Sequence, residues 1–214
     1  MSGVELGDPT SQAFRSRSSS WVDAAWIIGG SLLLGGLTSV AQGVLPDSIR
    51  PFANSPSGWA LLTVVMIAIR RPPLLPALFL GAFSFMGLVM GYTIVSELRG
   101  LTYHPLLWAA VALIAGPAIG WSTSATFDAR LPFAVTGSSL IAGVAITDAI
   151  YGLTAVADTT SPAYWVIAGT AGVVFLGCAG LRRPVRWWVV ALRVGLTIGW
   201  VSLGSAGYAA LNTA

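Results

Sequence analysis

The chain has 214 residues, of which 55% are hydrophobic and only 9% are charged, and its mean hydropathy is +0.79. Soluble globular domains carry roughly a quarter charged residues, so the composition excludes a cytosolic enzyme, a nucleic-acid-binding domain and a disordered protein. The formal net charge is +3, and all eleven basic residues are arginine. A single cysteine, Cys178, provides no internal disulfide. These features predict an all-α, polytopic membrane helix bundle.

Residues 1–20 are polar and serine-rich, which is typical of a disordered cytoplasmic tail. We expect residues 21–214 to form a single transmembrane helical domain in the cytoplasmic membrane, because six runs reach the ~20 apolar residues that a spanning helix needs. These runs are residues 21–45, 73–96, 104–124, 131–156, 162–181 and 187–211. A seventh run, residues 58–69, would form only about 18 Å of helix. It is predicted to be a short, irregular second span, which gives about seven helices in all.

The arginines predict the orientation, because cytoplasmic loops collect basic residues. With a cytoplasmic N-terminus and seven spans, the outer side receives only Arg50 and Arg99, and Arg193 lies within the last span. The cytoplasmic side receives the other eight, which are Arg15, Arg17, Arg70, Arg71, Arg130, Arg182, Arg183 and Arg186. This imbalance predicts a cytoplasmic N-terminus and an external C-terminus.

The segment before the short run predicts a break in the chain at membrane depth. Pro46, Pro51 and Pro56 favour an irregular, extended path, and Ser57 stands where it could cap the following helix. A helix that begins inside the membrane would direct its free N–H groups toward a cavity in the outer half. The alternative is a tilted span that begins near Pro51, with the linker folded on the surface.

Asp148 is the most informative single residue, because it lies within the predicted fifth span, about 12 Å below its outer end. An ionisable group at that depth is by default a functional candidate, and Tyr151 shares its helix face. The alternative is a structural carboxyl held by neighbouring hydroxyls such as that of Thr147. Glu97 and Asp23 are further candidate catalytic acids, for which ordinary polarity at the helix ends is the alternative.

Amide and aromatic side chains are predicted to join Asp148 in one pocket in the outer half. The candidate substrate-binding residues are Gln42, Asn54, Trp59, Tyr92, Trp108, Tyr151, Trp165 and Trp200. An aromatic-walled cavity with one buried acid suits a lipophilic small molecule, whereas membership of an interfacial belt is the alternative for any single tryptophan. The sequence has no HExxH motif, Cys/His cluster, Walker A motif or dinucleotide-binding glycine fingerprint. We therefore expect no metal, no cofactor and no nucleic acid, with the lipid bilayer as a partner.

Several short motifs resemble those of an uncharacterised bacterial, actinobacterial-type family of multi-pass integral membrane proteins. They are Leu37-Thr38-Ser39-Val40-Ala41-Gln42, Leu45-Pro46, Ala53-Asn54-Ser55, Gly58-Trp59, Gly91-Tyr92, Leu98-Arg99-Gly100 and Asp148-Ala149-Ile150-Tyr151. The resemblance implies a multi-pass fold and no assigned activity. Glu97 departs from the family pattern, in which a small residue is expected. In architecture alone, the chain is also similar to membrane-embedded terpene cyclases, which are small, metal-free and dependent on intramembrane acids.

These observations support three hypotheses of function. The first is a metal-independent, acid-initiated terpene or isoprenoid cyclase of isomerase or lyase type, in which Asp148 protonates the substrate and Glu97 or Asp23 acts as alternative acid or final base. Aromatic faces would stabilise the resulting cation. The second is a small-solute transporter, or the substrate-binding subunit of one, in which the short helix and Asp148 bind the solute. The third is a non-catalytic accessory membrane protein. The sequence leaves the oligomeric state open.

Overall fold

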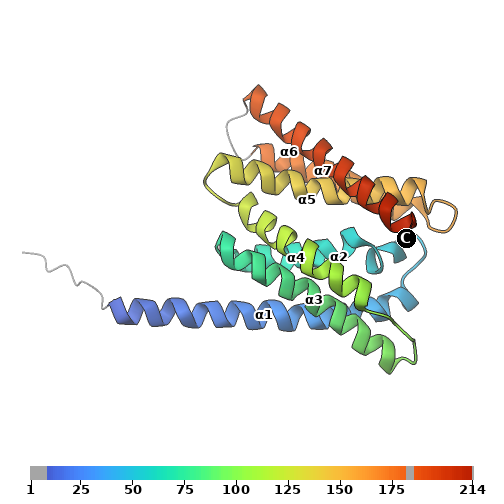
Figure 1. The fold of residues 1–214 in the computed structure, drawn as a ribbon, viewed down its shortest axis with the longest axis horizontal. Helices are drawn as coiled ribbons and strands as arrows, with labels where there is room; N and C mark the ends of the chain where they lie inside the picture. Colours follow the sequence, from blue (N-terminus) through green and yellow to red (C-terminus); the bar gives the residue numbers. More distant parts are fainter. Residues whose placement is uncertain (1–8, 182–185, 214) are drawn as a thin grey trace, which may run out of the picture.

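The computed structural model describes residues 9–181 and 186–213, and within these ranges every regular element is helical (Figure 1). The elements in chain order are α1 (Pro9–Val44), the 3-10 turn η1 (Arg50–Ala53), α2 (Pro56–Arg70), α3 (Leu74–Leu98), α4 (Leu106–Thr126), α5 (Leu131–Thr154), α6 (Pro162–Leu181) and α7 (Trp187–Thr213). Six of these helices are long and apolar enough to cross a membrane, and α2 is a shorter apolar helix. The predicted all-α fold with seven helices and a short second one is confirmed.

Helix α1 is longer than the sequence predicts. It has 36 residues, about 54 Å at 1.5 Å per residue, and the segment of it that can span a membrane is Trp21–Val44. Residues 9–20, expected to belong to a disordered tail, are helical, whereas residues 1–8 of that tail lie outside the described residues. Once the apolar span has formed a helix, each further turn costs little, because every added residue gains one backbone hydrogen bond.

Helix α2 is too short to cross the bilayer alone. It has 15 residues, about 22 Å of helix, against ~30 Å of hydrocarbon. Its N-cap is Ser55, whose Oγ accepts a hydrogen bond from the Gly58 N–H at 3.0 Å, so the expectation that Ser57 caps the helix is wrong. Pro56 at the first helical position explains this start, since proline needs no N–H partner there.

The helices form two groups with α2 between them. Figure 1 shows α1, α3 and α4 on one side and α5, α6 and α7 on the other. Helix α2 contacts α1, α3 and α4 as well as α5. It therefore joins the two groups, and the residues at its first turn lie where the groups meet.

Small residues allow the helices of the first group to approach closely. A Cβ atom on Gly120 of α4 would collide with the backbone of Ala77 in α3, and one on Gly91 of α3 would collide with the backbone of Leu32 in α1. Such contacts drive helix association in lipid, where no hydrophobic force acts between helices. By contrast, Gly199 of α7 has no neighbour within 4 Å of a built Cβ atom among the described residues.

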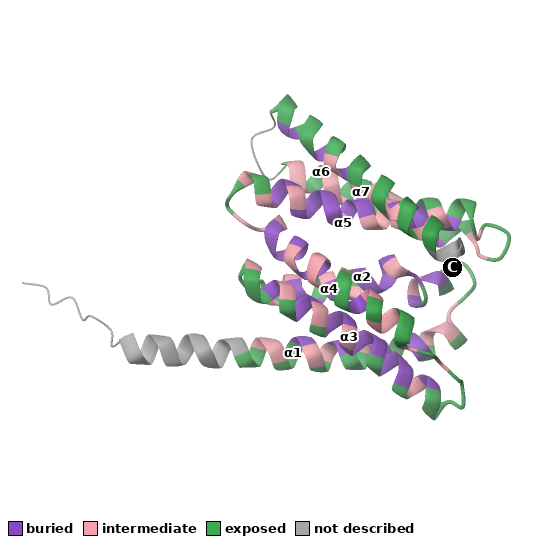
Figure 2. Cartoon of the chain, in the orientation of Figure 1, coloured by how far each residue is buried: buried purple, intermediate pink, exposed green. Residues whose placement is uncertain are grey.

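The long helices differ in the share of their residues that is buried inside the bundle (Figure 2). Helix α5 is the most buried of the long helices, and α6 and α7 are the least. Large apolar side chains such as Phe79 and Leu113 are exposed on the outside of the bundle, where hydrocarbon rather than water would contact them.

The two ends of the bundle carry different connections between the helices. One end carries the α2–α3 and α4–α5 connections, with an ion pair between Asp23 and Arg70 and another between Asp128 and Arg130. The other end carries η1 and the α3–α4 and α5–α6 connections. We call the latter the outer end, because the arginine distribution predicts that it faces the outside.

Candidate functional site

Asp148 lies in α5, six residues before the helix ends at Thr154, which places it about 9 Å inside the outer end. Its side chain is only 1% exposed. Its Oδ2 atom accepts a hydrogen bond from the backbone N–H of Ser57 at 2.9 Å, and its Oδ1 atom accepts one from the hydroxyl of Tyr208. The carboxyl group therefore joins three helices, α5, α2 and α7, within the bundle.

The bond from Ser57 explains how α2 can begin at this depth. The first N–H groups of a helix have no partner within the helix and carry a partial positive charge. Ser57 is in the first turn of α2, and the Asp148 carboxyl accepts its N–H. Thr147, the neighbour expected to hold this carboxyl, makes no side-chain hydrogen bond among the described residues. Thr147 is therefore not the hydroxyl that holds the carboxyl, whereas the broader alternative, a carboxyl held by a hydroxyl group, agrees with the bond from Tyr208.

Two tyrosines flank the carboxyl and fix its surroundings. Tyr208 of α7 stacks on Tyr151 of α5 with ring centroids 4.1 Å apart and planes 9° apart. This stacking presents the Tyr208 hydroxyl to Asp148, and aromatic pairs of this kind contribute stability beyond the area that they bury. Asp148 therefore links the α5–α7 contact to the start of α2.

A second hydroxyl cluster holds α6 against the same turn. The Tyr164 hydroxyl lies 2.7 Å from the Ser55 Oγ and 2.9 Å from the Ser57 Oγ. The ring of Phe52 in η1 contacts Tyr164 edge to face, with centroids 6.4 Å apart. Because all three hydroxyl groups are buried, each must be paired to avoid the cost of desolvation, and the cluster fixes the position of η1.

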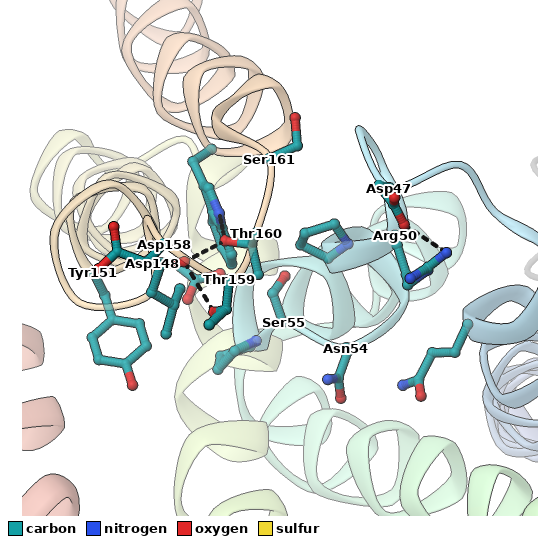
Figure 3. Close-up of a pocket in the computed structure, with 15 residues that line it drawn as sticks. Asp47, Arg50, Asn54, Ser55, Asp148, Tyr151, Asp158, Thr159, Thr160 and Ser161 are labelled. Carbon is teal, nitrogen blue, oxygen red and sulfur yellow. Dashed lines mark hydrogen bonds and ion pairs between the residues drawn. The ribbon is translucent and has the colours of Figure 1, made fainter.

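A cavity of about 530 Å³ lies above this turn at the outer end. Its walls come from the end of α1, η1, the end of α5, the α5–α6 connection and the start of α6. In Figure 3, Ser55 and Asn54 lie between Asp47 on one side and the acidic residues of α5 and the α5–α6 connection on the other. The lining residues are Gln42, Asp47, Arg50, Pro51, Asn54, Ser55, Pro56, Asp148, Tyr151, Val156, Asp158, Thr159, Thr160, Ser161 and Trp165. The short second helix therefore begins at Pro56, beside this cavity, and not near Pro51.

Polar contacts organise the cavity walls. Asp47 and Arg50 form an ion pair with an Oδ1–Nη2 distance of 2.6 Å. On the opposite wall, the Trp165 indole N–H donates to the Thr160 hydroxyl at 2.8 Å. Among the described residues, no three His, Cys, Asp or Glu side chains come together as metal ligands would. The cavity thus offers single charges, hydroxyls and an indole ring to a ligand.

An aromatic cluster adjoins this cavity, with Asn54 and Ser55 between the two, but its rings do not line the cavity. Trp59 contacts Tyr92 and Trp108 with ring centroids 5.5 Å and 6.0 Å apart. With Tyr103 these rings surround a void of only about 10 Å³, close to the space that one water molecule needs. The cluster is part of the protein core and leaves no room for a lipophilic ligand.

Gln42 and Tyr103 connect this cluster to the outer end. The Tyr92 hydroxyl donates to the Gln42 Oε1 at 2.9 Å, and the Gln42 Nε2 donates to the Ala53 carbonyl at 3.1 Å. In the α3–α4 connection, burial raises the pKa of the Tyr103 phenol to about 12, with a smaller contribution from Tyr92. Gln42 therefore holds the end of η1 at Ala53, and Phe52 joins the same turn to Tyr164.

The predicted ligand-binding residues divide into three places. Gln42, Asn54, Tyr151 and Trp165 share the cavity with Asp148. Trp59, Tyr92 and Trp108 belong to the aromatic cluster around the smaller void. Trp200 packs against Gly143 of α5 and lines neither space. The predicted single aromatic pocket therefore corresponds to one polar cavity and one filled aromatic cluster.

The three candidate acids do not meet. Asp23 is 18% exposed and lies at the end of the bundle opposite to Asp148, where its Oδ1 accepts from the Arg70 Nε at 2.6 Å. Glu97 is exposed at the end of α3 and is not among the residues that line the cavity. Neither residue is placed to exchange a proton with a ligand beside Asp148.

Sequence reasoning missed Tyr208, Tyr164 and the backbone N–H of Ser57. Tyr208 and Tyr164 both lie near the outer ends of their predicted spans, at about the depth of Asp148. A search for hydroxyl groups at matching depth would have found both as possible partners of a buried acid. The N–H of Ser57 could be anticipated only from a helix that begins at membrane depth.

Six long apolar helices, an apolar outer surface and a buried polar network define a multi-pass membrane protein. Within that class, the chain belongs to DUF6518, a family of unknown function whose model matches residues 15–214. This membership agrees with the resemblance of its motifs to an uncharacterised family of multi-pass membrane proteins. No curated protein and no solved structure matches the chain.

Proposed function

We propose that the protein binds a small, positively charged polar solute in the outer cavity, as the solute-binding part of a transport system in the cytoplasmic membrane. The observation that carries the proposal is the cavity of about 530 Å³ at the first turn of the short helix α2, with the buried Asp148 at its base. A short helix that begins at a cavity resembles the discontinuous helices at the binding sites of membrane transporters. A volume of this size suits a small ligand.

The charges in the cavity favour a cation. Its lining has three carboxyl groups, those of Asp47, Asp148 and Asp158, and one guanidinium group, that of Arg50. One positive and three negative groups give a formal charge of −2 when all are ionised, and a recess with walls of low dielectric concentrates such a field. An ammonium or guanidinium group would also find the Trp165 ring, and cations are attracted to the faces of indole rings.

The same arrangement gives less support to an acid-initiated cyclase. That mechanism needs a carboxylic acid with a free proton that faces a hydrocarbon substrate. Both oxygens of Asp148 accept hydrogen bonds from the protein, and the adjoining cavity is lined by ionic and hydroxyl groups. Two of the predicted rings, Tyr151 and Trp165, line this cavity. Three others, Trp59, Tyr92 and Trp108, are packed around the smaller void, where they could not surround a carbocation beside Asp148.

The proposal is tested by ligand-dependent stabilisation of the purified protein in detergent. The probes are small primary amines and guanidines, compared with alcohols and carboxylates of the same size. A ligand that binds only the folded state stabilises it by about 2.7 kcal/mol at 100 times its Kd, which a thermal melt detects. We expect cationic probes alone to raise the Tm.

Two variants locate the effect. Asp148→Asn keeps the shape of the side chain and removes its charge, and it should abolish the rise in Tm. Glu97→Gln removes an exposed charge from the same end of the bundle without changing the cavity lining, and it should keep the full rise. If no cationic probe raises the Tm of the wild-type protein, or if both variants respond alike, the proposal is wrong.

A further inference from the structure

A second, apolar space lies on the side of α2 that faces α6. It is a groove of about 600 Å³ between η1, α2, α5 and α6, and the end of α1 and Ile119 of α4 also line it. Among the residues that the structure describes, no charged residue lines it, and its only side-chain hydroxyls are those of Ser57 and Tyr164 at one end. These hydroxyls already bond to each other at 2.9 Å, so the groove offers a ligand almost exclusively hydrocarbon contacts.

The groove opens sideways from the bundle. Leu61 on α2 and Ile167 on α6 line it from opposite sides, and they are 50% and 59% exposed. Both belong to apolar helices, so the opening is continuous with the surface that faces the lipid. Water in such a groove would find no hydrogen-bonding partners along most of its length. A hydrocarbon chain loses nothing by entering it.

We propose that this groove is a binding site for one acyl chain of a bilayer phospholipid, which enters from the leaflet at the outer end. The chain lies along Val144 and Ala145 of α5 and against Ala168 and Ala171 of α6, where small side chains leave the space open. Its position does not depend on the solute-binding proposal, because the two spaces share no lining residue.

A bound chain also supports the polar network from its apolar side. Phe52 and Tyr164 both line the groove, and Tyr164 holds Ser55 and Ser57 at the start of α2. A chain that fills the groove contacts the outward side of these two rings and keeps water from reaching the hydroxyl cluster. Loss of the lipid should therefore loosen the first turn of α2.

The test uses the full protein in nanodiscs made from phosphatidylcholine that carries a photoactivatable diazirine in one acyl chain. After irradiation, mass spectrometry locates the cross-linked side chains. We expect cross-links on groove residues such as Ile167 to exceed several-fold those on equally exposed apolar residues outside the groove, such as Phe79 and Leu113.

Matched variants on α6 make the test specific. Ala171→Phe fills the groove and should reduce groove cross-linking several-fold, whereas Val173→Phe changes a lipid-facing position outside the lining and should leave it unchanged. Ala168→Leu narrows the same groove with a smaller side chain and serves if Ala171→Phe fails to fold. Equal cross-linking over all lipid-facing residues, or no loss in the groove-filling variant, would overturn the proposal. So would a dimer in nanodiscs that Ala171→Phe converts to a monomer, because the occupant would then be a second copy of the chain.

Discussion

Replacing Asp148 should destabilise the protein by an amount that depends on which hydrogen bonds survive. In Asp148→Ala, the Ser57 N–H and the Tyr208 hydroxyl both lose their acceptor, and each buried unpaired group costs about 1–3 kcal/mol. Some relief comes from the adjoining cavity, so we expect the free energy of unfolding to fall by about 2–4 kcal/mol. In Asp148→Asn, the amide oxygen can accept from Ser57 while its NH₂ donates to the Tyr208 oxygen. Only the charge–dipole contribution is lost, which is at most about 2 kcal/mol.

The assay is reversible unfolding in mixed micelles, followed by tryptophan fluorescence. Tyr208→Phe keeps the ring stacked on Tyr151 and removes only the hydroxyl, so it should cost about 1 kcal/mol. Because Asp148 and Tyr208 are in direct contact, the double variant should show a coupling free energy of at least about 0.5 kcal/mol. A stability of Asp148→Ala within the error of the wild-type value would refute the role of this carboxyl in holding the first turn of α2.

Three further predictions concern other parts of the bundle. Gly120→Ala should lower the unfolding free energy by about 1–3 kcal/mol because the new methyl group meets the α3 backbone, whereas Gly199→Ala, with open space around it, should be neutral or stabilising in the same unfolding assay. Tyr103 has a folded pKa of about 12 against an ordinary value of 10.0, so its contribution to stability is complete below pH 10 and is lost as the pH rises toward 12. The Tyr103→Phe variant should therefore lose less unfolding free energy than the wild-type protein between pH 10 and pH 12. An identical loss in the two proteins would contradict the raised pKa of Tyr103. Arg70→Gln should cost about 1–3 kcal/mol by leaving Asp23, which is 18% exposed, without its partner. Arg130→Gln should cost less, because the Arg130 side chain is 61% exposed and Asp128 still accepts the backbone N–H of residue 130.

Much of the fold follows from the sequence because the membrane imposes a simple rule. A helix must satisfy its own backbone to cross lipid, so apolar length predicts the number and limits of the spans. That rule identified the six long helices and the short α2 within a few residues at each end. It does not describe polar segments next to a span, and this is why the helical residues 9–20 were expected to be a tail.

The candidate site was predictable only in part. Depth along the chain correctly placed Asp148, Asn54 and Gln42 at one end of the bundle, and these residues line one cavity. The rotation of each helix about its axis is set by packing against its neighbours and not by hydropathy. The sequence therefore could not show that Tyr208 faces Asp148, or that Trp59 faces away from the cavity into a filled cluster.

The central claim, that a cavity above Asp148 opens to the outside and takes a solute, is tested most directly by labelling a cysteine at its wall. Asn54 is exposed and lines the cavity, so Asn54→Cys in a Cys178→Ala background provides a single reactive thiol. A membrane-impermeant maleimide added to intact cells should label it, and a cationic solute that raises the Tm should slow the labelling. Ala129→Cys, in the connection at the other end of the bundle, should react only after the cells are permeabilised. An Asn54→Cys protein that resists labelling from outside, or that reacts equally fast with and without the solute, would contradict the account.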